Sequence, residues 1–160
     1  MIIPFQNFGG AMNEISIAEQ RFRDNAQVFK DLGFNTQFPY IQAWIETGKF
    51  QHVIGNNNYW GIMSRPNDGY DKVIINGVVW ADWKETPDAF WAYAKKIWKL
   101  YPDCWKNRNG IYTAYNHGLM TGLYGEWCPD IDKDTGKNYE QSLNSLTEYA
   151  ISIGNDMVTP

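Results

Sequence analysis

Two short stretches decide the fold of this chain: Gln42-Ala43-Trp44-Ile45-Glu46-Thr47-Gly48 and, after a short gap, Asn58-Tyr59-Trp60-Gly61-Ile62-Met63. Ile41, Trp44 and Ile45 repeat at helical spacing, which predicts a helix from about Phe38 to Thr47 with its apolar face against a core. Gly48 then ends this helix. An acidic residue therefore closes an apolar helix and is followed by a loop rich in aromatic and amide side chains.

Glu46 lies in the last turn of this helix. Exposed carbonyl groups give a helix end a partial negative charge, which disfavours an ionised carboxylate. If Trp44, Phe50 or Trp60 also shields the carboxyl from water, both effects raise its pKa, as a general acid that works near neutral pH requires. The alternative is an ordinary solvated glutamate at a helix end.

Composition favours one globular domain with more aromatic side chains than its core needs. The 160 residues suffice for one domain, residues 1–160, with an irregular arm at residues 1–12. Aromatic residues reach 16%, with eight tryptophans, more than a core of this size usually needs. Flat rings suit the apolar faces of sugars as well as bases or peptides, so carbohydrate is a candidate partner.

Charge and hydropathy exclude two classes of partner. The formal net charge is −4, and the basic residues are scattered, so no stripe of Lys and Arg is available to follow a phosphate backbone. We therefore expect no nucleic-acid partner. No window approaches the roughly 20 apolar residues of a membrane span, and the start of the chain lacks a standard signal peptide.

The rest of the pattern predicts a mainly α fold (α+β) with one small β-hairpin. A first helix begins after Ser16 and ends at Gly33. Asn76-Gly77 between two β-branched runs predicts a two-residue hairpin. Thr86-Pro87-Asp88 starts a helix, with Thr86 as its cap, that Pro102 ends. Further helices are expected near residues 103–107, 111–123 and 139–153, the last with a buried stripe.

Two other features leave alternatives open. Cys104 and Cys128 either stay free or form a single bridge, and a Cys/His nucleophile lacks a recognisable signature. Asp130, Asp132 and Asp134 alternate as at the start of a calcium loop, but the glycine comes one place late and the twelfth position lacks a glutamate. The other interpretation of this segment is a solvated turn.

The order of these pieces resembles the lysozyme-like glucosaminidase family of bacterial and phage peptidoglycan hydrolases, which includes the flagellar muramidase-type domains. YIQAWIETGKF resembles the family motif Gln-Ala-x-x-Glu-Ser-Gly, and NNNYWGIM resembles Asn-x-Phe-Gly-Ile-Lys. VVWADWKETPDAFWAYAKKI resembles the Phe-Arg-x-Tyr element and the proline-started helix after it. GLYGEWCPD and NYEQSLNSLTEY resemble the closing Gly-Tyr-Ala-x-Asp motif and the final helix. The resemblance runs from about Tyr40 to Tyr149.

The resemblance implies a set of site residues. Glu46 takes the position of the general acid, and Tyr124 that of a tyrosine implicated in catalysis. The loop with Asn58, Tyr59 and Trp60 forms one wall of the cleft. The resemblance further implies two sugar-binding roles. Rings that stack on sugars would come from Tyr59, Trp60, Trp80 and Trp83, and contacts to acetamido groups from asparagines 56–58. Trp60 as a core aromatic and Tyr124 as a packing residue are the alternatives.

The sequence departs from the family pattern at the second carboxylate. The family usually places it in the hairpin, within Thr-x-Glu-Tyr, and this hairpin has no glutamate. Asp68 and Asp71 are the nearest candidates, and Asp71 is preferred because it enters the strand directly. Trp80-Ala81-Asp82-Trp83 also lacks the arginine of Phe-Arg-x-Tyr. A retaining course, an inverting course and help from the substrate's own acetamido group all remain open.

We therefore expect a peptidoglycan hydrolase that cuts the glycan strand without a cofactor, as an endo-β-N-acetylglucosaminidase. The alternatives are a muramidase or lytic transglycosylase of the same fold, or an inactive sugar-binding or tail-structural module. The resemblance and the lack of a signal peptide suggest a phage lysin that starts in the host cytoplasm and reaches the cell wall in a virion or by lysis. Other virion proteins would then be partners.

Overall fold

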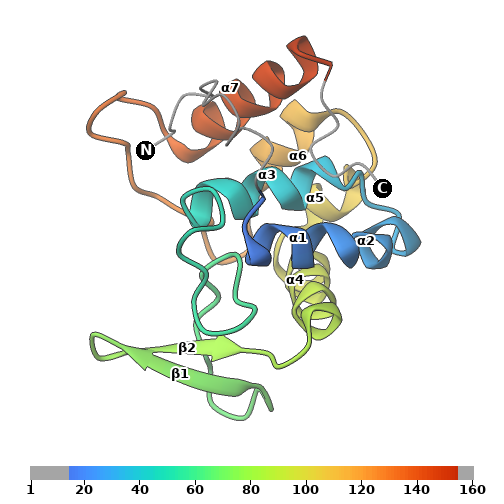
Figure 1. Cartoon of the computed structure of the whole chain (residues 1–160). Coiled ribbons are helices and arrows are strands. Elements are labelled where there is room, and N and C mark those ends of the chain that lie inside the picture. The colour runs from blue at the N-terminus through green and yellow to red at the C-terminus, as the bar shows by residue number, and fades with distance from the viewer. Residues whose placement is uncertain (1–14, 155–160) are drawn as a thin grey trace.

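The computed structural model describes residues 15–154 (Figure 1). Its elements, in chain order, are α1 (Ile17–Asp24), α2 (Gln27–Asp31), α3 (Gln37–Glu46), β1 (Asp71–Ile75), β2 (Val78–Asp82), α4 (Thr86–Leu100), α5 (Pro102–Lys106), α6 (Tyr112–Gly118) and α7 (Tyr139–Ser152). Figure 1 shows the hairpin of β1 and β2 at one end of the molecule and α7 at the other. The predicted mainly α fold with one small hairpin is confirmed. The predicted arm at residues 1–12 lies outside the described residues.

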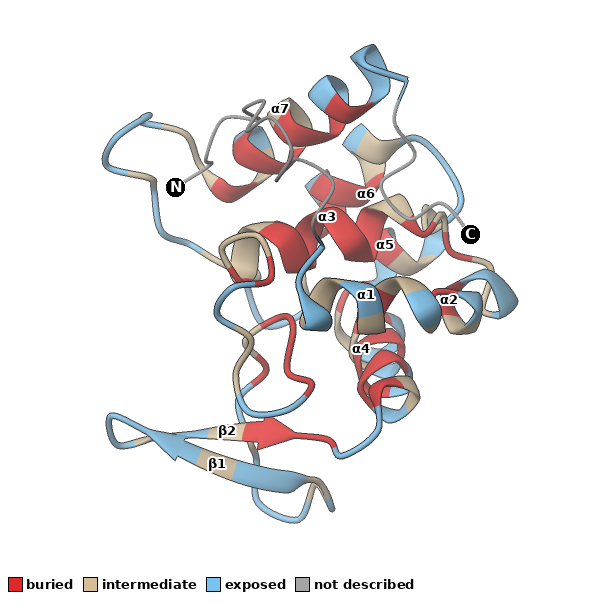
Figure 2. Ribbon diagram, in the orientation of Figure 1, coloured by how far each residue is buried: buried red, intermediate tan, exposed pale blue. Residues whose placement is uncertain are grey.

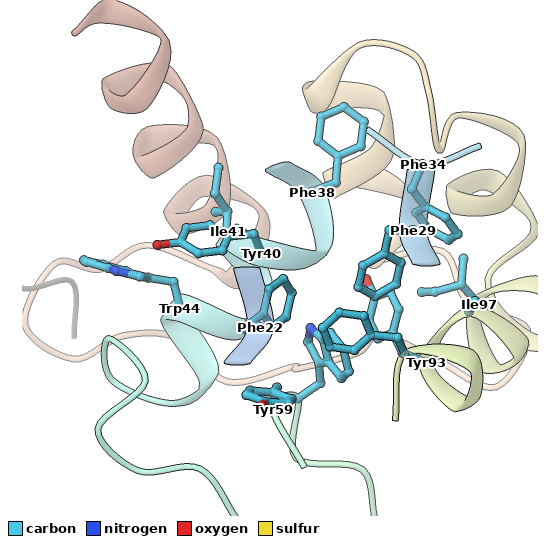
Figure 3. Close-up of a cluster of buried hydrophobic side chains, with 14 of the residues drawn as sticks. Phe22, Phe29, Phe34, Phe38, Tyr40, Ile41, Trp44, Tyr59, Tyr93 and Ile97 are labelled. Atoms are coloured by element: carbon cyan, nitrogen blue, oxygen red, sulfur yellow. The ribbon is translucent and has the colours of Figure 1, made fainter. Parts of the chain in front are cut away.

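Helix α3 runs through an aromatic core. Its residues Phe38 to Trp44 are all buried, and rings from α1, α2 and α4 pack around it (Figure 3). Phe22 lies 4.5 Å from Phe90 between ring centroids, as does Phe29. Such ring pairs add to the stability that comes from buried area alone. The core therefore holds the C-terminal end of α3, and with it Glu46, in one position.

The hairpin forms with the turn that the sequence predicts. Its strands are antiparallel, with Asp71 opposite Asp82 and Ile75 opposite Val78. Asn76 and Gly77 have φ values of 50° and 79°, the left-handed conformations that a two-residue turn of this kind requires. Most of the hairpin is exposed, and the buried part of β2 is its C-terminal end (Figure 2).

A third extended segment lies along the other edge of β2. The amide of Ser64 donates to the carbonyl of Val79 at 3.1 Å, and that of Ala81 to Ile62 at 3.0 Å. The segment directly follows Gly61, so this pairing connects the loop of residues 56–61 to the hairpin. We call residues 56–82 the hairpin lobe.

Three predicted helix boundaries were wrong. The first helix breaks at Asn25, whose side chain donates to the Arg21 carbonyl at 2.8 Å and thus competes with the helical backbone. Glu85, not Thr86, holds the N-cap position of α4 and makes no side-chain cap hydrogen bond, while the Thr86 hydroxyl donates to Asn57. Helix α6 ends at Gly118, before the predicted Leu123. Within residues 15–154, no helix is both long and apolar enough to cross a bilayer.

Candidate active site

Glu46 ends α3 at the junction between the helices and the hairpin lobe. It lies in the last turn of the helix, as predicted, and is its last residue, with a half-buried side chain. A Cβ atom placed on Gly61 would lie 3.7 Å from Oε2 of Glu46 and 3.8 Å from the Trp80 ring. Gly61 also has a φ of 66°, which favours glycine. The loop backbone therefore comes into contact distance of the carboxylate, with Trp80 beside it.

Three side chains from distant parts of the chain act on the Glu46 carboxyl. Burial raises its pKa above the usual 4.5, while interactions with Tyr139 and Trp127 and the positive charge of Lys96 oppose the rise. The net effect is a raised pKa, so burial outweighs the three partners. A carboxyl that holds its proton to higher pH is suited to general acid catalysis.

Two buried hydrogen-bond donors accompany Glu46. Gln42 lies one helical turn earlier, and its side-chain oxygen accepts from the Tyr93 hydroxyl at 2.5 Å. The Gln42 amide nitrogen and the Tyr139 hydroxyl are both buried, and the hydroxyl interacts with the Glu46 carboxyl and with Gln42. The Gln42 amide nitrogen donates to no described residue within hydrogen-bond distance. Such a group costs free energy when left unpaired. It is therefore available to hold a polar group of a ligand, or a water, near the carboxyl.

Lys96 of α4 brings a positive charge to the site. Burial, aided by repulsion from Arg65, lowers its pKa from 10.5 to about 8, although the charge of Glu46 raises it. Its ammonium group lies 4.6 Å from the centroid of the Trp127 ring. Lys96 also lines a cavity of about 220 Å³ whose other charged side chains are those of Arg65, Lys95, Lys99 and the carboxylate candidate Asp68. We call it the basic cavity, because four of its five charged groups are positive. In a chain of net charge −4, this is a local concentration of positive charge.

Two of the three asparagines predicted to bind acetamido groups, Asn57 and Asn58, are buried and structural, whereas Asn56 is exposed and its role stays a prediction. Asn58 donates to the carbonyls of Ile62 and Ala81, both at 2.8 Å, and accepts from the Ile62 amide at 3.0 Å. Asn57 donates to the carbonyls of Trp83 and Lys84 and accepts from two hydroxyl groups, those of Tyr59 and Thr86. Both side-chain amides are buried, and their nitrogens and oxygens are all hydrogen-bonded within the protein. They hold the loop to the hairpin and cannot contact a substrate in this conformation.

Burial also corrects the prediction for most of the aromatic platforms. Tyr59 and Trp60 have no exposed surface, and Trp83 is 5% exposed. Trp60 stacks on Tyr93 at 4.3 Å between ring centroids and donates its indole N–H to the Pro39 carbonyl at 3.0 Å. Trp60 is thus a core aromatic, the alternative given above. Trp80 is half-buried beside Gly61, and its role as a platform stays a prediction.

Neither Tyr124 nor Asp71 is among the groups that shift the pKa of Glu46. Tyr124 is 85% exposed and makes no hydrogen bond or ring contact with a described residue. Asp71 is exposed at the start of β1, where it lines a cavity with Trp83 and Trp91. Of the described groups that shift the pKa of Glu46, none is a carboxylate. The catalytic roles of Tyr124 and Asp71 stay predictions, and the side chains that act on Glu46 are those of Tyr139, Trp127 and Lys96.

The remaining candidates do not form sites. Cys104 and Cys128 are free thiols, and the buried Cys104 donates to the Tyr115 carbonyl. Asp132 accepts from the amides of Asp134 and Thr135, so that loop closes on itself as a turn. Across residues 15–154, no group of three or more His, Cys, Asp or Glu side chains is placed to hold a metal ion.

Solved structures share this arrangement of elements. One is a mutant of a peptidoglycan hydrolase from Sphingomonas sp. A1, with a TM-score of 0.54 and 21% identity over 83% of this chain and 99% of that one. Another is the catalytic domain of the autolysin Auto from Listeria monocytogenes, with a TM-score of 0.54 and 16% identity over 85% of this chain and 86% of that one. The chain has a lysozyme-like fold. The fold implied by the resemblance is thus confirmed. No protein-family model matches the sequence, and no curated protein matches it either.

Sequence reasoning missed four residues around Glu46. They are Gln42, Lys96, Trp127 and Tyr139, which lie on α3, α4, the loop before α7 and the first turn of α7. Gln42 had a signal, because residues four apart share one helix face and Glu46 was already identified. The other three had none, since only the tertiary fold brings them to the end of α3.

Proposed function

We propose that this chain is a peptidoglycan hydrolase that cleaves the glycan strand as an endo-β-N-acetylglucosaminidase. One observation carries the proposal: Glu46, with a raised pKa, lies half-buried where the hairpin lobe meets the helices of a lysozyme-like fold. Trp80 offers a ring beside the carboxyl, and the basic cavity offers positive charge for the carboxylates of a peptidoglycan peptide stem.

In the proposed reaction Glu46 acts as the general acid. Its proton moves to the glycosidic oxygen as the bond from that oxygen to C1 breaks, and a water finally adds hydroxide to C1 and returns a proton to Glu46. The Gln42 amide nitrogen and the Tyr139 hydroxyl beside Glu46 would orient a substrate oxygen or the water. Since no carboxylate among residues 15–154 shifts the pKa of Glu46, we propose that the substrate's own acetamido oxygen assists at C1.

Digestion of purified peptidoglycan by the wild type and by Glu46→Gln, with mass spectrometry of the fragments, tests the proposal. New reducing N-acetylglucosamine ends in the wild-type digest support it. Reducing muramic ends would indicate a muramidase, anhydro-muramic ends a transglycosylase, and no release from the wild type a binding or tail-structural module. Equal activity of Glu46→Gln would remove Glu46 from the mechanism.

We also propose, from the family resemblance alone, a phage lysin that acts after delivery in a virion or by lysis. Expression of the chain in bacterial cytoplasm, with and without a pore-forming membrane protein, tests this. Lysis that depends on the pore supports release from the cytoplasm. Lysis without any pore contradicts that route.

A further inference from the structure

Two exposed tryptophans stand out on α4. Trp91 is 55% exposed and Trp98 is 57% exposed. They are seven positions apart and therefore share one helix face, about 10 Å from each other along the axis. Large rings exposed on one face signal a binding surface more often than isolated apolar residues do. Neither residue takes part in the site around Glu46.

These rings open onto a cavity of about 760 Å³, which we call the tryptophan pocket. It lies between α4 and the base of the hairpin, and its aromatic lining is Tyr70, Trp83, Trp91, Trp98 and Trp105. Trp83 is almost fully buried, and its indole N–H donates to no described residue. The pocket thus combines flat apolar faces with an unpaired donor.

Charged groups complete the rim of the tryptophan pocket. Asp71 and Asp88 supply carboxylates, and Lys84 and Lys95 supply ammonium groups. Flat rings with hydrogen-bonding groups at the edge match a sugar, which has apolar ring faces and hydroxyl groups around its circumference. The mixed signs on the rim do not favour a strongly charged ligand.

The tryptophan pocket lies next to the basic cavity. Tyr70 and Lys95 line both. Lys96, on the wall of the basic cavity, acts on the charge of Glu46. The basic cavity therefore lies between the surroundings of Glu46 and the pocket that holds Trp91 and Trp98.

We infer that the tryptophan pocket binds distant sugar residues of the glycan strand whose bond is cut beside Glu46. The inference rests on the proposed function, since it names the same polymer as the occupant. It makes cleavage depend on strand length, because only a long strand reaches from Glu46 to Trp91 and Trp98. Short oligosaccharides occupy the region near Glu46 alone.

The test compares the wild type with the double variant Trp91→Ala/Trp98→Ala on long glycan strands and on short soluble oligosaccharides. We expect kcat/KM to fall about tenfold or more on long strands, since two aromatic contacts are lost, and to stay within about twofold on short ones. Trp91→Phe/Trp98→Phe keeps flat rings and should recover most of the loss. Ile111→Ala, a 70% exposed residue outside the pocket, controls for the loss of an exposed apolar side chain.

Equal losses on long and short substrates, or no loss on either, would overturn the inference. Co-sedimentation of Glu46→Gln with insoluble peptidoglycan separates this inference from the proposed function, because it needs no catalysis. If the wild type releases no fragments but binding still weakens about tenfold when Trp91 and Trp98 are replaced, the proposed function fails and the pocket stands. Unchanged binding in that experiment refutes the pocket.

Discussion

Replacement of Asp82 by alanine tests how the hairpin lobe is attached. Asp82 ends β2, is 6% exposed, and accepts from the backbone amides of Asn56 and Asn57 at 3.0 Å and from the Asn56 side chain at 3.2 Å. Gly55 lies so close that a Cβ there would come within 2.4 Å of the Asp82 carboxylate, so the loop has closed tightly around this acceptor.

The cost of Asp82→Ala follows from the groups it leaves unpaired. The Asn57 amide is buried, and an unpaired buried donor costs about 1–3 kcal/mol. The Asn56 residue is exposed and regains water, so its loss is nearer 1 kcal/mol. We expect unfolding free energy to fall by about 2–4 kcal/mol, and Tm by roughly 5–15 °C for a chain of this size.

Urea unfolding at pH 7 measures this difference, and Asp71→Ala is the matched control. Asp71 faces Asp82 across the hairpin but is exposed, so its replacement should change stability by less than about 0.5 kcal/mol. Asp82→Asn keeps one acceptor oxygen and should fall between the two. A loss below about 1 kcal/mol for Asp82→Ala, or an equal loss for Asp71→Ala, would refute the role of this network.

Three further predictions concern charge in the site. Because the folded state raises the pKa of Glu46, the stability that this group contributes is complete below the unfolded value of 4.5 and is lost as the pH rises. The urea midpoint of Glu46→Gln should therefore be higher than that of the wild type at pH 7 and equal to it near pH 3. An equal midpoint at pH 7 would contradict this. Lys96→Met removes a positive charge that lowers the pKa of Glu46, so the basic limb of the pH profile of kcat/KM should move to higher pH. A shift to lower pH would exclude an effect of the Lys96 charge on Glu46. Added salt should raise KM for peptidoglycan but not for neutral chitooligosaccharides, and Lys99→Gln should weaken the salt dependence of KM. The same salt dependence of KM on both substrates would argue against a role for the basic cavity.

The sequence predicted the elements that carry strong local signals. The 3.6-residue repeat and Gly48 located α3 and its end, and Asn76-Gly77 located the hairpin. Local signals failed where a side chain had two possible partners. At Asn25 the side chain bonds back to its own helix, and the predicted single helix becomes α1 and α2.

The position of Glu46 at the end of α3, beside the loop that follows, was predictable, but the roles of the loop side chains were not. An aromatic residue beside a glutamate has the same sequence pattern whether it stacks on a sugar or packs in a core, and the rings of Phe22, Phe90 and Tyr93 decided the case of Trp60. Asparagine is equally ambiguous, since its amide serves a ligand or a carbonyl of the chain. Lys96 and Tyr139 follow Glu46 by 50 and 93 positions, and no local pattern connects them.

The pairing of Glu46 with Lys96 has a consequence for how the acid works. Lys96 has a pKa of about 8, so it stays mostly positively charged up to neutral pH. A fixed positive charge stabilises the ionised carboxylate, which makes Glu46 a stronger acid and a weaker base. Burial has the opposite effect, because it raises the affinity of the carboxylate for a proton. Lys96 therefore helps the half of the proposed reaction in which the proton moves to the leaving oxygen, and burial helps the half in which Glu46 accepts a proton from water. On this argument Lys96→Met should slow the step in which the glycosidic bond breaks more than the step in which water attacks.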